Sequence, residues 1–311
     1  MGSSLTPKWI ILIRLVAAIC TLSAPGQAQV RGVYPLGMSA TNSGVTPESG
    51  FTYANLFLFY ARDTLRGTNG EIVATGEQSL MMDMNNFIWV SKKIGILGGA
   101  KFSLSATLPI ANNSLTDSVL GTLGGGGGFA DSYYQPLILG WQKKHADIRA
   151  IYGFLAPTGR FNAGASNNVG SGYWTHTVSA GETFYLTQNR MTAISGFEMY
   201  EFHTTQQGTN IHPGQNLNLD YSLTQAFQLP AGLRLQVGLA GYGQWQTTDK
   251  TGPNITPAQA TSHYVVNALG FASNVILPAR KVSLGVKYFR EFANRSTYQG
   301  YSLQISGAIS F

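Results

Sequence analysis

The final eleven residues of the chain, YSLQISGAISF, alternate between apolar and polar side chains with a period of two. Successive side chains of a β-strand point to opposite faces, so this segment predicts a strand with one apolar and one polar face. The two faces carry Tyr301, Leu303, Ile305, Gly307, Ile309 and Phe311 on one side, and Ser302, Gln304, Ser306, Ala308 and Ser310 on the other.

Charged residues make up 11% of the 311 residues, against about 25% in a typical soluble domain. Glycine, tyrosine and phenylalanine are abundant, at 37, 15 and 16 residues. Beyond the first thirty residues no stretch approaches the roughly 18 consecutive apolar residues of a membrane-spanning helix. Few charges without long apolar runs indicate strands that alternate in polarity, and argue against a bundle of apolar helices.

The N-terminus predicts a secretory signal peptide over residues 1–28. Lys8 supplies the positive region, an apolar stretch follows, and small residues precede a cleavage site after Ala28. Cys20, the one cysteine of the sequence, lies inside this segment, so we expect no disulfide in the mature chain. Residues 29–48 are then expected to be a periplasmic lead-in, and residues 49–311 a single domain.

Strand-like stretches recur about every 20–25 residues, and helical periodicity is absent. The clearest alternation lies in 214–228, 232–247 and 280–291. We predict twelve strands, near 50–62, 79–92, 99–109, 130–143, 145–156, 172–186, 189–203, 214–228, 232–247, 262–277, 280–291 and 299–311.

The connections between these strands alternate in length. Those after the even-numbered strands are short turns, and those after the odd-numbered strands are mostly long and polar, including 63–78, 111–129, 158–171, 204–213 and 248–261. Outer-membrane barrels have short periplasmic turns, long outer loops and an even number of strands. The pattern therefore predicts an all-β fold, a closed antiparallel transmembrane β-barrel of about twelve strands.

Closure follows from physical necessity, because an unpaired sheet edge in lipid leaves backbone groups without partners, at several kcal/mol each. A secreted β-sandwich shares the alternation and is the alternative. Aromatic residues near strand ends, namely Tyr200, Trp245, Tyr264, Tyr288, Tyr301 and Phe311, favour the membrane, where they form interfacial girdles. A last strand ending on phenylalanine also resembles the terminal insertion signal of outer-membrane barrels.

Sequence motifs give little support to catalysis, metal binding or nucleic-acid binding. The five glycines at 124–128 lack the following helix and lysine of a phosphate loop, and are expected to form a flexible outer loop. The histidines lack metal-ligand spacing, and Ser179 with His176, or Ser262 with His263, are strand neighbours poorly placed for nucleophilic catalysis. A net charge of +6 without basic runs does not indicate nucleic acid. We expect no enzyme activity and no cofactor.

The inward-facing polar residues of the predicted barrel are the stronger candidates for function. A barrel of this size is larger than side chains fill neatly and smaller than open porins, so a constricted or partly plugged passage is expected. A hydrogen-bonded filling of the lumen is the alternative. The candidate lining residues are Asn216, Asn218, Asp220, Arg234, Gln236, Tyr242, Gln244, Gln246, Lys287 and Glu291.

Several phrases together resemble a known family. They are GVYPLG at 32–37, SGFTYANLFLFY at 49–60, FLAPTGRF at 154–161 (similar to LPTG-x-[YF]), GYWT at 172–175, LNLDYSL at 217–223 (similar to FHVDYAL) and KYFREF at 287–292 (similar to KYQREF). In order and spacing they are similar to the meta-pathway phenol-degradation family of outer-membrane proteins, over about residues 32–311.

The resemblance implies a bacterial outer-membrane barrel associated with aromatic catabolism, and supplies no ligand residues. The leading hypothesis is passive uptake of small hydrophobic or aromatic molecules across the outer membrane. The alternative is a closed structural or surface-interaction barrel that acts through its outer loops. The expected partners are outer-membrane lipid, the permeant and, during assembly, periplasmic chaperones and the barrel-insertion machinery. We expect a monomer.

Overall fold

Thirteen antiparallel strands form one sheet in the computed structural model, which describes residues 31–117 and 121–311. The expected signal peptide and Cys20 lie outside the described residues. The strands are β1 (Gly50–Arg66), β2 (Ile72–Ile94), β3 (Ala100–Asp117), β4 (Gly121–Phe129), β5 (Ser132–Gln142), β6 (Ala146–Ala156), β7 (Thr175–Tyr185), β8 (Thr192–His203), β9 (Asn216–Gln228), β10 (Arg234–Gln246), β11 (Val265–Leu277), β12 (Val282–Glu291) and β13 (Tyr298–Ser310). Short helical turns occupy η1 (Gly95–Leu97), η2 (Pro230–Gly232), α2 (Pro257–Thr261) and η3 (Pro278–Arg280). Within the described ranges, no helix has the length and apolar character needed to cross a membrane.

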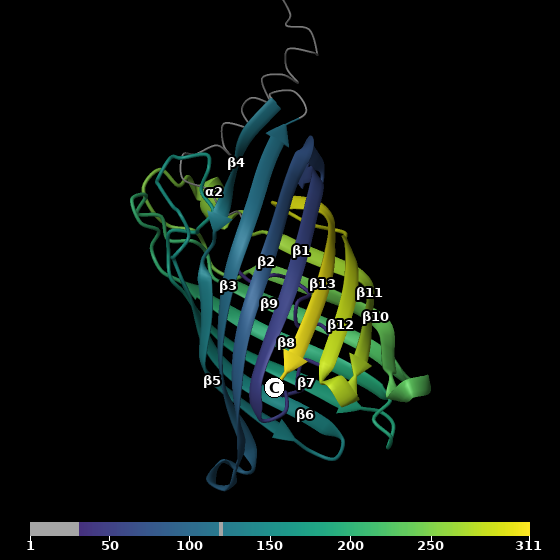
Figure 1. Ribbon diagram of the computed structural model, residues 1–311. Coiled ribbons are helices and arrows are strands. Elements are labelled where there is room, and N and C mark those ends of the chain that lie inside the picture. Colours follow the sequence, from purple (N-terminus) through teal and green to yellow (C-terminus); the bar gives the residue numbers. More distant parts are fainter. Residues whose placement is uncertain (1–30, 118–120) are drawn as a thin grey trace, which may run out of the picture.

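The sheet closes into a barrel because β1 pairs with both β13 and β2, and β2 pairs in turn with β3 (Figure 1). β4 and β5 both pair with β3, β4 along its extracellular half and β5 along its other half. They therefore share one position in the wall, interrupted at Ala130 and Asp131. The predicted closed antiparallel barrel of twelve strands is confirmed.

The alternation of apolar and polar side chains sorts them to the two faces of this wall, as expected. In β9, Asn218 and Asp220 are fully buried inside, whereas Leu223 on the outside is 49% exposed. In β13, Gln304 is 1% exposed on the inside, and Ile305 next to it is 48% exposed on the outside. The apolar outer face is the surface that a barrel presents to lipid.

Two of the expected outer loops are shorter than predicted because their flanking strands run further. β1 continues to Arg66 and β2 begins at Ile72, so only residues 67–71 connect them. Residues 111–117 continue β3, and residues 121–129 form β4, where a loop over 111–129 was expected. In Figure 1 this hairpin projects beyond the end of the barrel opposite the C-terminus.

The glycine run 124–128 lies within β4, so the expectation of a flexible outer loop is wrong. Strand pairing with β3 supplies the backbone hydrogen bonds. The missing side chains let the loop between β6 and β7 lie against the strand: a Cβ on Gly124 would lie 2.9 Å from the Ser166 carbonyl oxygen, and one on Gly126 would lie 2.3 Å from that of Asn167. Glycine allows such close approach of two backbones, which composition alone does not reveal.

Candidate functional site

Residues 31–48, named here the lumen segment, run inside the barrel, where a periplasmic lead-in was expected, and only Glu48 at the end of the segment is exposed. Tyr34, Leu36 and Ala40 are 6%, 3% and 0% exposed and pack in one core with inward-facing wall residues such as Phe197 and Phe289. The segment has no period of two, because it is not a strand. Most of its hydrogen-bond partners in the wall are more than a hundred residues away in sequence, so no local pattern marks its position.

Two buried carboxylates of the wall bind the backbone of the lumen segment. Glu201 of β8 accepts hydrogen bonds from the amides of Val33 and Tyr34, both at 3.0 Å. Asp220 of β9 accepts from the amides of Gly37 at 2.9 Å and Ser39 at 3.0 Å, and from the Tyr34 hydroxyl at 2.6 Å. Burial, and after it the Asp220 carboxylate, raises the pKa of Tyr34 well above its ordinary value, which keeps this hydroxyl a donor.

Arg31 begins the described part of the segment and forms a buried ion pair with Glu291 of β12. Its Nη1 and Nη2 donate to the two oxygens of that carboxylate at 2.7 and 3.2 Å, and further donors reach Thr297, Tyr60 and the carbonyl of Tyr298. Burial alone would lower the pKa of Arg31, but its interactions with the surrounding groups, Glu291 foremost, together raise that pKa, so the guanidinium stays charged. Bidentate geometry and saturated hydrogen bonding are what make a buried ion pair tolerable.

The carbonyl groups of the segment are bound by the other side chains of the wall. Lys287 Nζ donates to the Gly37 carbonyl at 3.0 Å and to that of Met38, and Gln304 donates to the Leu36 carbonyl at 2.8 Å. Gly37 has a φ of +82°, and a Cβ there would lie 2.5 Å from the Phe289 ring. Only glycine fits this bend beside the wall.

The ten predicted lining residues all point inward, and nine of them are buried, with Arg234 half-buried. Asp220, Gln236, Lys287 and Glu291 bind the lumen segment, and Asn216 and Asn218 donate to Glu201. Tyr242 contacts Tyr60 and Glu291, Gln246 donates to the Thr248 carbonyl, and Arg234 to the Arg190 carbonyl. Of the ten, only Gln244 lines one of the two lumen cavities described next.

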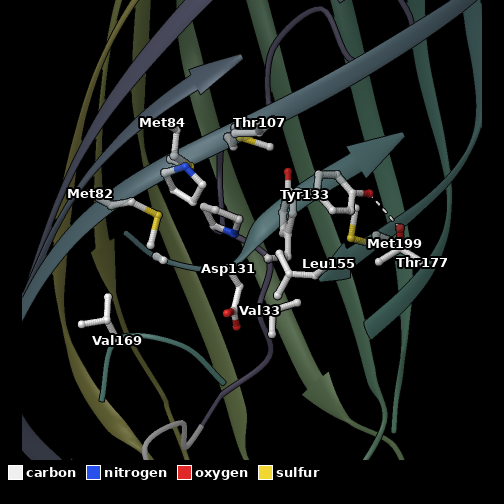
Figure 2. A pocket seen from close by; sticks show the side chains of 15 residues that line it. Val33, Met82, Met84, Thr107, Asp131, Tyr133, Leu155, Val169, Thr177 and Met199 are labelled. Atoms are coloured by element: carbon white, nitrogen blue, oxygen red, sulfur yellow. Dashed lines mark hydrogen bonds between the residues drawn. The ribbon is translucent and has the colours of Figure 1, made fainter. Parts of the chain in front are cut away.

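An apolar cavity of about 110 Å³ lies between the lumen segment and the opposite wall (Figure 2). Methionines from three directions reach it: Met38 of the segment, Met82 and Met84 of β2, and Met199 of β8. Tyr133 stands at its edge, with its hydroxyl 2.7 Å from that of Thr177, so the ring faces the cavity without an unsatisfied polar group. The remaining lining residues are Val33, Tyr34, Pro35, Thr107, Pro109, Ala130, Asp131, Leu155, Val169 and Thr177.

The carboxylate of Asp131 at this cavity is already occupied. It accepts hydrogen bonds from the amides of Gly159 and Ser171 and from the Ser171 hydroxyl, and so fixes the loop between β6 and β7 over the cavity.

Along β2, a second cavity of about 170 Å³ lies on the extracellular side of the first, lined by Tyr60, Arg62 and Gln78 among others. Over residues 31–117 and 121–311, no three His, Cys, Asp or Glu side chains gather as a metal site requires.

Sequence reasoning missed the residues that line these cavities. Met82 and Met84 are spaced by two on one strand, which is a signal for one face, but the neighbouring Met81 is equally apolar, so the sequence does not show which face points inward. Glu201 was also missed. Tyr264, expected in the outer aromatic girdle, is instead 3% exposed inside the barrel, where it donates to Asn216 and accepts from the Gly32 amide.

Comparison with solved structures supports the fold. The chain is similar to the COG4313 outer membrane channel from Pseudomonas putida F1, with a TM-score of 0.71 and 15% identity over 86% of this chain and 97% of that one. It is also similar to the β domain of the Bordetella autotransporter BrkA, with a TM-score of 0.52 and 11% identity over 85% of this chain and 100% of that one. A search of curated protein sequences finds no match.

A closed barrel with an apolar outer face and these structural neighbours belongs in the bacterial outer membrane. The family model described as "Putative MetA-pathway of phenol degradation" matches residues 62–306, most of the barrel. The chain therefore belongs to this family of outer-membrane β-barrels.

Proposed function

We propose that the protein is an outer-membrane channel for the passive uptake of small hydrophobic or aromatic molecules. The apolar cavity beside the lumen segment is the observation that carries this proposal. An engineered apolar cavity of about 150 Å³ in another protein stays dry and binds benzene. The cavity here is slightly smaller, and four of its lining residues are methionines, whose flexible side chains adapt to a ligand.

The wall around this cavity is the part of the lumen that holds the segment least. The hydrogen bonds that anchor the segment come mainly from β8 to β10, β12 and β13, whereas Met82 and Met84 of the cavity wall belong to β2. A permeant can therefore pass beside the segment by displacing apolar side chains, without breaking those hydrogen bonds. Passage also requires binding weak enough for release, which dispersion contacts with a few side chains supply.

The test is uptake of labelled toluene and phenol at limiting concentration, in cells that lack the protein and in cells complemented with it. Complementation should speed entry, and the variant Met82→Trp, which fills the cavity, should abolish most of that gain. Met81→Trp is the matched control, since Met81 lies next along β2 but is 47% exposed on the outer face. Faster entry that Met82→Trp leaves intact would remove this cavity from the path.

A closed barrel that acts through its outer loops is the alternative. The observation in its favour is the lumen segment itself, which fills the barrel and is held by buried hydrogen bonds and an ion pair. Equal entry of both compounds with and without a correctly inserted, heat-modifiable barrel would favour this second function.

A further inference from the structure

The second cavity differs in chemistry from the apolar one, although the two adjoin. They share Val33, Tyr34, Pro35, Met82 and Val169 as lining residues. The second cavity is lined by polar side chains and by two guanidinium groups, those of Arg31 and Arg62. A molecule that spans both would have an apolar part on the periplasmic side and a polar part on the extracellular side.

The two arginines are not in the same state. Arg31 is neutralised by Glu291, with both oxygens of that carboxylate engaged. Arg62 of β1 forms no ion pair with any described residue: its Nη1 donates to Gln78 at 2.8 Å, its guanidinium stacks over the Tyr60 ring at 3.9 Å, and its Nε is buried without a hydrogen-bond partner. The cavity therefore contains one uncompensated positive charge.

An uncompensated charge inside a barrel is costly, since burial of an ion is tolerated chiefly when the ion is paired. Stacking on Tyr60 recovers part of that cost. The nearby carboxylate of Glu291 is already engaged by Arg31, so a structural role for Arg62 alone explains its position poorly. An anion in the cavity removes the imbalance. A carboxylate suits it best, because its planar pair of oxygens matches the hydrogen-bond donors of a guanidinium.

We propose that the two cavities together bind an aromatic carboxylate, with its ring among Met82, Met84 and Tyr133 and its carboxylate at Arg62. This inference rests on the proposed channel function and names the class of permeant it favours. The ring occupies the apolar cavity of about 110 Å³, and the charged group replaces the missing partner of Arg62 in the cavity of about 170 Å³.

The experiment compares benzoate with benzyl alcohol, which has a similar size and no charge, for binding to the purified barrel in detergent and for uptake into proteoliposomes. The intact protein should prefer benzoate, and Arg62→Gln should reduce that preference at least tenfold, which corresponds to about 1.4 kcal/mol. Arg62→Lys, which keeps the charge and loses the planar donors, should fall between the two. Arg290→Gln is the control, because Arg290 is exposed on the outer face of β12.

The outcomes separate this inference from the channel proposal. Benzyl alcohol bound and transported as well as benzoate by the intact protein would overturn the carboxylate site and leave the channel standing. The same conclusion follows if Arg62→Gln folds and keeps the full preference for benzoate. Neither compound bound nor transported would sink both proposals. Should Arg62→Gln fail to fold, the preference of the intact protein and of Arg62→Lys still decides the question.

Discussion

Asp220→Ala should release the lumen segment from the wall while the barrel itself stays closed. The carboxylate of Asp220 accepts three hydrogen bonds from the segment, from two backbone amides and the Tyr34 hydroxyl. Hydrogen bonds to a charged group contribute about 1.5–3 kcal/mol each. Even at the low end of that range, docking of the segment should weaken by roughly 4 kcal/mol, close to a thousandfold in the ratio of docked to undocked molecules.

The assay measures how fast a buried cysteine in the segment reacts with a water-soluble maleimide. Ser43 is 1% exposed, and Ser43→Cys changes its side chain little, so the new thiol reacts only when the segment undocks. Cys20 is replaced by serine in all samples. We expect Asp220→Ala to raise the labelling rate by about a thousandfold, and Asp63→Ala, at an exposed position near the outer end of β1, to leave it unchanged.

A labelling rate within threefold of the parent, in a variant that remains heat-modifiable, would refute the reasoning. It would mean that Glu201, Lys287 and the Arg31–Glu291 pair hold the segment without Asp220. A barrel that fails to form would point to a different error, since it would make Asp220 a requirement for closure of the wall.

Three further predictions concern stability, measured by urea unfolding of the barrel in lipid vesicles, with the maleimide assay as the readout for the segment. Glu291→Gln leaves Arg31 buried without an opposite charge and should weaken segment docking by about 3–5 kcal/mol; an unchanged labelling rate would contradict this. Gly37→Ala meets both a positive φ and the Phe289 ring, so it should loosen the segment by more than about 1 kcal/mol, whereas a neutral effect would show that the bend relaxes freely. Glu198→Leu should stabilise the barrel by roughly 1 kcal/mol, because the carboxylate of Glu198 is exposed on the lipid-facing side of β8. The carboxylate of Glu182 lies beside the same residue, Gly196. Destabilisation by Glu198→Leu would indicate that these carboxylates have a partner in the membrane.

The strands of the barrel wall can be predicted from the sequence because each strand is specified by residues that are neighbours in the chain. In β9, β10, β12 and β13 the alternation of apolar and polar residues predicts which face of the sheet each side chain lies on, and the short turns predict which end of the barrel is periplasmic. The prediction fails where a local pattern has two structural meanings. The glycines at 124–128 resemble a flexible loop, yet they form β4 because their lack of side chains admits the backbone of a distant loop.

The contents of the lumen could not be predicted in the same way. The position of the lumen segment depends on pairings such as Arg31 with Glu291, which are 260 residues apart. Polar inward residues such as Asp220 and Lys287 were recognisable as a set, but their sequence does not distinguish an anchor for a segment from the lining of a passage. No local feature of the sequence predicts that Arg62 lacks an acidic partner in the fold.

The lumen segment divides the barrel into two halves that differ in how well they tolerate amino-acid substitutions. Strands β8 to β10, β12 and β13 carry most of its anchors, so a substitution at Glu201 or Asp220 alters how firmly the segment fills the lumen. The half around Met82 and Met84 carries cavity walls and few of those anchors. Barrels with this layout can therefore acquire new ligand preferences by single substitutions in one half, while the other half preserves the seal of the membrane against unwanted solutes.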